Sequence, residues 1–346
     1  MPAKPTLDLL RSLSDEHVLR ALMEQRRATR AELAAATGLS KPTVSESVRR
    51  LSESGAVIDT GERTTGRGRV GTYYALPEVG RALVCGIAPE GIVAEAVDVY
   101  GDVVARAHAE VPGADTVARA LEQVAGDVAD GPFRLAVVSA ADPVDRETGR
   151  LIELPDAPFL VGALDPPAVL ATLVDGPVTV DNDVNWAARG ERAAGDFVYL
   201  YLGEGLGCAV VSDGEVRRGH AGLAGEIAHV VTTGPNGEAM RLTDVFRSLD
   251  LRRAGSTAID VPRLLGTLDT TRDALARALG GVLNAIVALT DPAVIVVGGR
   301  WGEAILPTLE ATPRTVSLQA AQVDDPLTAA RAAALTQLRD AVVTMA

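Results

Sequence analysis

The sequence predicts a mixed α/β protein in which a small helical domain precedes a larger body made of two lobes. Strand-like and helical stretches alternate through residues 81–346, which favours an α/β fold for the body. Two body segments, 83–104 and 197–216, share one pattern of strand, Glu-Gly turn, strand, glycine turn and strand. This repeat indicates a duplicated unit with a cleft between its two copies.

Charge is distributed unevenly along the 346 residues, whose net charge is −13. Residues 1–80 hold 12 lysines and arginines against 10 acidic residues, and the remainder holds 21 against 36. Since polyanions attract cationic surfaces, only the N-terminal domain is expected to touch nucleic acid.

The two cysteines, Cys85 and Cys208, form neither a disulfide framework nor a metal-binding spacing, which is typical of a protein in a reducing cytoplasm. The most apolar stretch, residues 274–299, is interrupted by charged residues, an asparagine and a proline. We therefore expect no membrane span.

The N-terminal domain, residues 1–80, is predicted to begin with three short helices. The first opens near Ser14, and the second opens at Thr29, which has the capping-box spacing to Glu32. The second helix is expected to stop at Gly38, because glycine is common just beyond a helix end. Pro42 then lies in the first turn of the third helix, where its missing N–H costs little.

The third helix has the pattern of a DNA-recognition helix. Val44, Val48 and Leu51 recur at helical spacing and face the core. The opposite face carries short polar groups first and a cation later, as base edges and phosphates require. The predicted DNA-contacting residues of this helix and its cap are Ser40, Lys41, Thr43, Ser45, Glu46 and Arg49.

A predicted β-hairpin follows, with strands at 56–60 and 73–76 and a tip rich in glycine and arginine at 65–71. Arg67 and Arg69 are expected to enter a minor groove, where negative potential is enhanced. Three amphipathic helices alone would also fit a purely structural bundle. The added cationic hairpin makes a winged helix-turn-helix that binds double-stranded DNA the favoured interpretation.

Polar side chains gather at two places in the body. Asn182 and Asp183 directly follow a predicted strand, where α/β sheets place ligands, and Glu226 and His229 form the second group. An amide, carboxylates and an imidazole suit a polyhydroxylated ligand, and Asp183 has the chemistry of a general base. From spacing alone, Asn182 and Asp183 fit helix caps equally well, and a lone histidine such as His229 is more often structural.

The chain resembles the ROK family of repressors, open reading frames and sugar kinases, and is most similar to its regulator branch. The matching stretches occur in family order at 181–191, 203–207, 213–219, 224–229 and 291–299. The resemblance implies a winged helix-turn-helix ahead of a two-lobed actin/hexokinase-like (ribonuclease H-like) body. It implies lobes at 81–190 and 191–327, with a C-terminal helix at about 328–346 packing back on the first lobe.

The same resemblance implies roles for individual residues. Asn182, Asp183, Glu226 and His229 occupy sugar-contact positions, and Asp183 matches the catalytic base of the family's kinases. The family's Pro-Gly-x-Val-Asp stretch appears here only as Ala141-Asp-Pro-Val-Asp145.

Two departures from the family pattern argue against kinase activity. The phosphate loop Asp-x-Gly-Gly-Thr is replaced by residues 85–91, which include Glu90, and the second loop, Gly-Thr-Gly, contains Glu204. A carboxylate held near a polyphosphate costs on the order of 4 kcal/mol at intermediate dielectric. We therefore expect no ATP binding, no catalytic residue and no cofactor.

A third departure concerns metal. Many family members carry a Cys-x-Cys-Gly-x-x-Gly-Cys zinc site after the Glu-x-x-His segment, whereas residues 230–240 contain no cysteine. Zinc requires about four nitrogen or sulfur ligands, so we expect no metal site here.

The leading hypothesis is a cytoplasmic transcriptional repressor, a homodimer or homotetramer that binds inverted-repeat operator DNA. A sugar or sugar phosphate in the interlobe cleft would modulate it. Two alternatives remain at this point: an ATP-dependent sugar kinase, and a ligand-independent regulator whose body only oligomerises.

Overall fold

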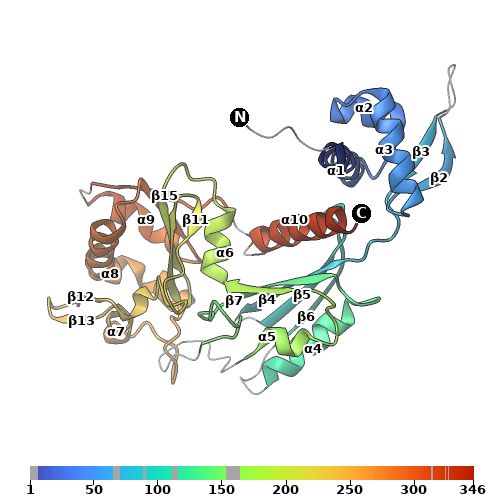
Figure 1. Ribbon diagram of the computed structural model, residues 1–346. Coiled ribbons are helices and arrows are strands. Elements are labelled where there is room, and N and C mark those ends of the chain that lie inside the picture. The colour runs from blue at the N-terminus through green and yellow to red at the C-terminus, as the bar shows by residue number, and fades with distance from the viewer. Residues whose placement is uncertain are drawn as a thin grey trace.

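The computed structural model describes residues 7–64, 71–88, 91–110, 116–152, 164–312, 315–323, 325 and 327–346. Figure 1 shows a small N-terminal head, two lobes side by side, and helix α10 (Thr328–Met345) lying between the head and the sheet of the first lobe. The fold class predicted from the sequence, a helical head on a duplicated α/β body, is confirmed.

The head contains α1 (Leu7–Gln25), α2 (Arg30–Thr37) and α3 (Lys41–Glu53), with β1 (Arg27–Thr29), β2 (Ile58–Arg63) and β3 (Thr72–Ala75) in the sheet order β1-β3-β2. The capping box of Thr29 and Glu32 is present, and Gly38 ends α2 with a left-handed φ of 71°. The expected start of the first helix near Ser14 was wrong. The Ser14 hydroxyl instead donates to the Leu10 carbonyl oxygen at 2.8 Å, a bond between successive turns of one helix.

The first lobe is built on β4 (Ala82–Ala88), β5 (Gly91–Val97), β6 (Val103–Ala109), β7 (Leu135–Ala140) and β8 (Val178–Asn182), in the order β6-β5-β4-β7-β8. Helices α4 (Val117–Asp127) and α5 (Pro166–Leu170) lie on one face of this sheet, and α10 lies on the other (Figure 1). The sheet is therefore covered on both faces, as sheets that include parallel strands usually are.

The second lobe repeats this arrangement. Its strands are β9 (Phe197–Leu202), β10 (Leu206–Ser212), β11 (Glu215–Val216), β14 (Val294–Gly298) and β15 (Ser317–Ala320), in the order β11-β10-β9-β14-β15. Around them lie η2 (Ile227–His229), the β12 (Val231–Thr233) and β13 (Ala239–Arg241) ribbon, α7 (Leu242–Ser248), α8 (Val261–Thr290) and α9 (Gly302–Glu310). Helix α6 (Asp183–Gly190) joins the lobes. The identical strand order in both sheets matches the repeat read from the sequence.

Helix α8 is long and apolar enough to span a membrane by length and composition alone, so the sequence expectation that no stretch would qualify was too strict. A core helix of a soluble domain meets the same criterion. The buried side chains of α8, among them Leu275, Leu279 and Leu283, pack in the hydrophobic core of the second lobe.

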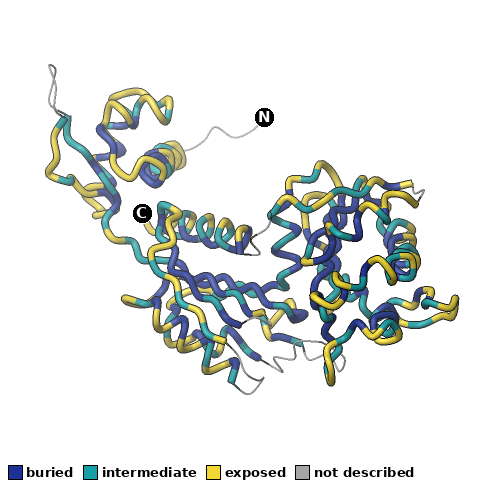
Figure 2. Tube along the Cα trace, turned by 180° about the vertical axis from the view of Figure 1, so that it is seen from behind, coloured by how far each residue is buried: buried dark blue, intermediate teal, exposed yellow. Residues whose placement is uncertain are grey.

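One hydrophobic core runs from the head into the first lobe. It combines Leu22 and Val48 of the head with Val84 and Val137 of the sheet, and Leu338 of α10 lies between them. Figure 2 shows the buried residues along α10 and along the strands beneath it. Head and lobe are therefore packed as one unit, with α10 as the shared element.

Polar contacts reinforce this packing. Arg20 of α1 pairs with Asp340 of α10 at 2.8 Å. The Arg339 guanidinium donates to the carbonyl oxygens of Val99 and Met23, at 3.0 and 3.3 Å, and so joins α10 to the first lobe and to the head.

A buried ion pair fixes α10 to the sheet. Glu95 of β5 is only 1% exposed, and both of its carboxylate oxygens accept bonds from Arg331 of α10, at 2.5 and 3.1 Å. The third guanidinium nitrogen of Arg331 pairs with Asp325 at 2.7 Å. This two-point contact sets the register of the helix on the strands.

Candidate functional site

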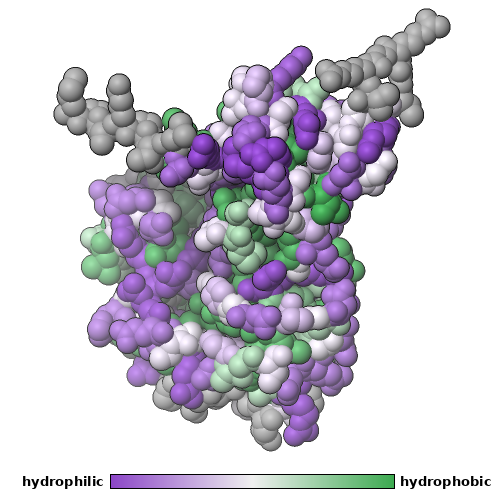
Figure 3. All heavy atoms as spheres, turned by 45° about the vertical axis from the view of Figure 1, so that its right-hand side comes forward, coloured by the Kyte–Doolittle hydropathy of each residue, from purple (hydrophilic) through white to green (hydrophobic). Residues whose placement is uncertain are grey.

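The recognition helix α3 presents the polar face that the sequence predicts. Ser40 is the N-cap: its hydroxyl oxygen accepts from the Thr43 N–H at 3.3 Å and lies 2.8 Å from the Thr43 hydroxyl. Lys41 is exposed at the first position of α3, and Ser45 is half-buried one turn later. Figure 3 shows that hydrophilic residues dominate the head end of the visible face, between two grey segments.

The sequence predicts that Arg49 contacts DNA, but in the structure its side chain is bonded to acidic residues of its own helix. Its guanidinium bonds to Glu46 at 2.6 and 3.1 Å and to Glu53 at 2.5 Å. The hydrogen bond from Arg49 lowers the pKa of Glu46, so this acid is ionised at neutral pH. DNA contact by Arg49 thus competes with two carboxylates on its own helix. Arg67 and Arg69 lie outside the described residues.

Sequence reasoning missed the contact that orients α3. Asp15 of α1 accepts two bonds from the Arg50 guanidinium, at 2.6 and 3.1 Å, and a third from the hydroxyl of the fully buried Ser47. These bonds fix the rotation of α3 about its axis and therefore the direction of its polar face. The partners are separated by more than 30 residues, so local spacing carries no signal for them.

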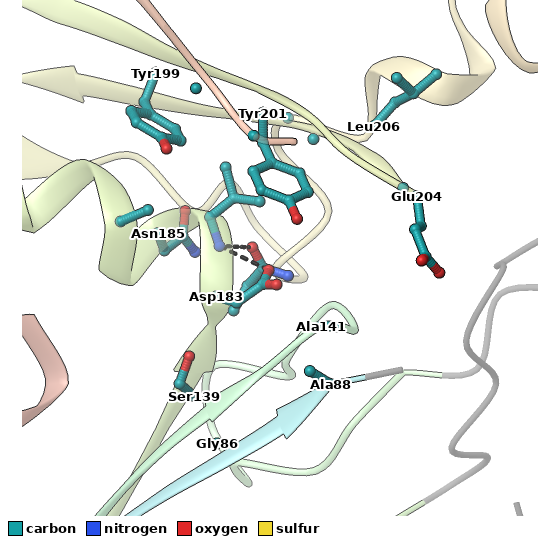
Figure 4. A pocket seen from close by; sticks show the side chains of 18 of the residues that line it. Gly86, Ala88, Ser139, Ala141, Asp183, Asn185, Tyr199, Tyr201, Glu204 and Leu206 are labelled. Carbon is teal, nitrogen blue, oxygen red and sulfur yellow. Dashed lines mark hydrogen bonds between the residues drawn. The ribbon is translucent and has the colours of Figure 1, made fainter. Parts of the chain in front are cut away.

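A cavity of about 840 Å³ lies between the two lobes. Its walls include the ends of β4 and β7, the start of α6, the β9–β10 turn and the loop before η2. All four predicted ligand residues line it: Asn182, Asp183, Glu226 and His229. Figure 4 shows Asp183, Tyr201 and Glu204 directed into the space above Gly86 and Ala88.

Asn182 and Asp183 stand at the junction of β8 and α6. The Asn182 side chain caps α6 by accepting from the Val184 N–H at 2.9 Å, and its amide donates to the Asp142 carbonyl oxygen at 3.2 Å. Asp183 accepts from the same N–H at 2.7 Å. Asn182 and Asp183 therefore cap α6 and line the cavity at the same time. A ligand role for these residues stays a prediction.

Close backbone packing holds Glu226 at the cavity. Gly225 has a φ of 97°, and a side chain there would collide with the Cys208 carbonyl oxygen of β10. A side chain on Gly222 would likewise collide with the Val144 carbonyl oxygen of the first lobe. The loop at residues 222–225 therefore lies against both lobes, and Glu226 directly follows it.

Glu226 faces a second carboxylate across the cleft. Asp142 follows β7 in the first lobe, is 3% exposed and lines the same cavity. Burial, together with the negative charge of Asp142, raises the pKa of Glu226 to about 7. Within the described part of the chain, neither the Glu226 carboxylate nor the His229 imidazole makes a hydrogen bond.

We expect Glu226→Gln to stabilise the protein at pH 8 relative to the unsubstituted chain, by about 2 kcal/mol. The folded-state pKa of Glu226 lies above its ordinary value of 4.5, so its ionisation lowers the stability of the fold as pH rises from about 4.5 to about 7. Urea unfolding at pH 5.5 and pH 8 measures this difference. An equal effect of the substitution at both pH values would contradict it.

Glu204, at the turn between β9 and β10, is not the uncompensated charge expected from the sequence. It is 5% exposed, and its Oε1 accepts from Arg253 at 2.6 Å and from Arg300 at 3.1 Å. Two guanidinium groups thus offset this carboxylate, so Glu204 repels a polyphosphate less than the sequence predicts. Glu90, its counterpart in the first lobe, lies outside the described residues.

Two tyrosines of β9 fill the space beside two glycines of the second lobe, Gly203 and Gly298. The hydroxyl end of Tyr199 occupies the space in front of Gly298, and the Tyr201 hydroxyl lies 2.5 Å from the place where a Cβ on Gly203 would stand. Trp301 donates to the Gly203 carbonyl oxygen at 2.8 Å.

The described residues contain no group of three histidine, cysteine or acidic side chains placed to hold a metal ion.

Two family models match this chain. Residues 94–240 match the ROK family, and residues 11–58 match a winged helix-turn-helix DNA-binding model. The xylose repressor of Caldicellulosiruptor bescii is 23% identical over 237 residues, 64% of this chain and 59% of that protein. A glucokinase of Halalkalibacterium halodurans is 45% identical over 69 residues, 18% of this chain and 21% of that enzyme. The chain thus spans less than two thirds of the length of both relatives.

Solved structures share the fold. A crystal structure of a ROK family transcriptional regulator, a homologue of the E. coli MLC protein, has a TM-score of 0.62 at 19% identity and covers 97% of this chain and 98% of its own. A ROK family glucokinase from Streptomyces griseus, in complex with glucose and AMPPNP, has a TM-score of 0.53 at 22% identity and covers 74% and 98%. The chain therefore contains a ROK family domain that includes residues 94–240, and a winged helix-turn-helix DNA-binding domain that includes residues 11–58 precedes it.

Proposed function

We propose that this chain is a cytoplasmic transcriptional repressor that binds operator DNA through α3 and the wing, and whose interlobe cavity takes a small ligand. The observation that carries the proposal is the union of an exposed, polar recognition helix with a two-lobed body around an 840 Å³ cavity. Relatives named as repressors support the DNA-binding role. We further propose a homodimer that binds an inverted repeat, so that protein and operator share two-fold symmetry.

Helix α10 supports a coupling between cavity and DNA. Leu327, the residue before α10, lines the cavity and packs in front of Gly86. The other end of α10 is paired with α1 of the head through Asp340 and Arg20. A ligand that changes the position of α10 on the first lobe would therefore also move the head. Such coupling requires different ligand affinities for the two arrangements.

The test of this proposal is genome-wide mapping of the DNA bound by the protein, followed by mobility shift of the recovered fragments with purified protein. We expect a recurrent inverted repeat that shifts at nanomolar protein. The absence of any enriched fragment, with a folded protein, would refute the proposed function.

A kinase is the second candidate, because Asp183 lines the cavity at the position of the family's base. The contacts of Glu204 argue against kinase activity. Its carboxylate already binds the guanidinium groups of Arg253 and Arg300, beside the turn between β9 and β10. An ATP phosphate would have to displace an internal anion whose bonds are charge-assisted.

We expect Glu204→Ala to create an anion site, with Arg253 and Arg300 released from their shared partner. Calorimetric titration with pyrophosphate should detect binding at least about tenfold tighter than that of the unsubstituted protein, equal to about 1.4 kcal/mol. Glu303→Ala removes another acidic side chain of the cavity wall and is the matched control. Measurable sugar-dependent ADP release by the unsubstituted protein, lost in Asp183→Ala, would instead favour the kinase.

A further inference from the structure

We propose that the ligand of the interlobe cavity is a glycoside with an apolar aromatic aglycone. Its sugar lies at the polar groups around Asp183, and its aglycone lies against the tyrosines of β9. The ligand class is therefore an aryl glycoside rather than a free sugar. This inference rests on the proposed function, because it names the kind of ligand that the cavity takes.

The first observation is a hydrophobic cluster of the second lobe and α6 that opens into the cavity. The residues that belong to this cluster and also line the cavity are Val184, Ala187, Tyr199, Tyr201 and Ala321. Ala187, Tyr201 and Ala321 are only partly buried. An apolar surface that stays partly exposed inside a cavity gains most from a ligand that covers it with apolar atoms of its own.

The second observation is the order of polar and apolar residues along the cavity wall. On α6, Asp183 is the first residue, and Ala187 follows one turn later. On the other side, Figure 4 shows the rings of Tyr199 and Tyr201 extending from β9 toward the start of α6. A sugar bound at Asp183 therefore has an aromatic surface beside it. A ring carried by that sugar would pack against the tyrosines, as aromatic groups in proteins do.

The third observation is that the first lobe supplies an apolar wall as well. Leu327, directly before α10, is 5% exposed and lines the cavity together with Ile87 of β4 and Val93 of β5. One methyl group of Leu327 lies 3.0 Å from the place where a Cβ on Gly86 would stand. An aglycone between the lobes would therefore be enclosed by apolar atoms from both, and would contact the segment that leads into α10.

The size of the cavity agrees with a ligand larger than one sugar ring. Its volume of about 840 Å³ lies in the upper part of the range of roughly 300–1,000 Å³ that small-molecule sites span. Asn182, Asp183, Glu226 and His229 provide polar groups for one sugar, and they form only part of the wall. The apolar part is left for a substituent of the same ligand.

A nucleotide is the other ring-bearing ligand to consider. The phosphate loops of the ROK pattern correspond to residues 85–91 and 203–205. In the second loop, ring and hydroxyl atoms of Tyr201 lie 2.5–2.7 Å from the place of a Cβ on Gly203, and Leu327 covers Gly86 of the first. Glycine turns bind phosphate through backbone N–H groups that a close ligand can reach. Side chains of the chain itself cover both glycines, which favours an uncharged substituent over a polyphosphate.

The experiment is calorimetric titration of the full chain with matched methyl and phenyl glycosides of glucose, galactose and xylose, each in both anomeric forms. The two members of a pair share the sugar and the anomeric configuration and differ only in the size of the apolar aglycone. We expect at least one phenyl glycoside to bind tenfold or more tightly than its methyl partner, because only the phenyl ring reaches the apolar wall. ADP, titrated in the same way, should bind more weakly than that phenyl glycoside.

Four variants complete the test. Tyr201→Ala should reduce the preference for phenyl over methyl at least fivefold, whereas Tyr201→Phe keeps the ring and should keep the preference. Ala321→Gln places a larger polar side chain in the apolar part of the wall and should also reduce the preference, which provides a second position in case Tyr201→Ala fails to fold. Leu265→Ala removes a leucine of α8 that is 44% exposed and lies outside the cavity wall, and should leave the preference unchanged.

Equal binding of phenyl and methyl glycosides, or no binding of any glycoside in the panel, would overturn the inference. So would ADP binding more tightly than every phenyl glycoside. A preference that survives in Tyr201→Ala, or in Ala321→Gln if the first variant is unfolded, would overturn it as well. Operator binding is measured separately by mobility shift. A protein that shifts its operator but shows no preference for the phenyl glycoside retains the proposed DNA-binding role and loses only the inference about its ligand.

Discussion

Glu95→Ala is expected to destabilise the protein by about 3–5 kcal/mol, because it leaves the Arg331 guanidinium without its main partner under α10. Glu95 is 1% exposed and Arg331 is 24% exposed, so water compensates little of the lost interaction. The midpoint of urea unfolding, followed by circular dichroism, measures the effect. Arg217→Ala breaks the exposed pair with Asp213 and should cost no more than about 1 kcal/mol.

A double variant separates the ion pair from the packing around it. Replacement of both partners by apolar residues of similar size, Glu95→Leu with Arg331→Met, removes both charges together. We expect it to lose clearly less stability than Glu95→Ala, since no buried charge is left unpaired. A loss in Glu95→Ala as small as that in Arg217→Ala would show that the pair contributes little to the fold.

The double substitution Lys41→Ala with Thr43→Ala is expected to weaken operator binding by about 100-fold or more. Both residues lie at the N-terminal end of α3, from which a recognition helix reaches base edges, and a good base contact is worth about 1–3 kcal/mol. Titration of the mapped operator fragment in a mobility shift measures the change, and the circular dichroism spectrum should stay the same.

The control for this experiment must remove a positive charge far from the head. Arg247→Ala does so on α7 of the second lobe, where the side chain is 68% exposed. Its operator affinity should match that of the unsubstituted protein. If both variants bound the operator equally well, α3 would not be the DNA-reading element.

Local sequence patterns predicted much of the head. The Thr29–Glu32 capping box, the glycine at the end of α2 and the proline in the first turn of α3 each depend on neighbouring residues only, so their spacing is visible in the sequence. The duplication of the strand and turn unit was likewise readable, because that pattern is itself local, and the two sheets have corresponding strand orders.

Contacts between distant residues escaped that reasoning. Glu204 is bonded to Arg253, 49 residues away, and to Arg300, 96 residues away, so nothing near Glu204 in the sequence indicates that its charge is balanced. Asp142 was visible only as a departure from a family pattern. Its position opposite Glu226 depends on how the lobes meet, which no local pattern encodes.

The place of α10 in the sequence has a consequence for synthesis on the ribosome. The helix follows the other elements that the structure describes, and its Asp340 pairs with Arg20 of α1, which lies 320 residues earlier. The head and the first sheet emerge early, yet the apolar face of that sheet stays uncovered until residues 328–345 have left the exit tunnel. A nascent or truncated chain therefore exposes a hydrophobic surface for most of its translation, and is at that stage a natural client for chaperones.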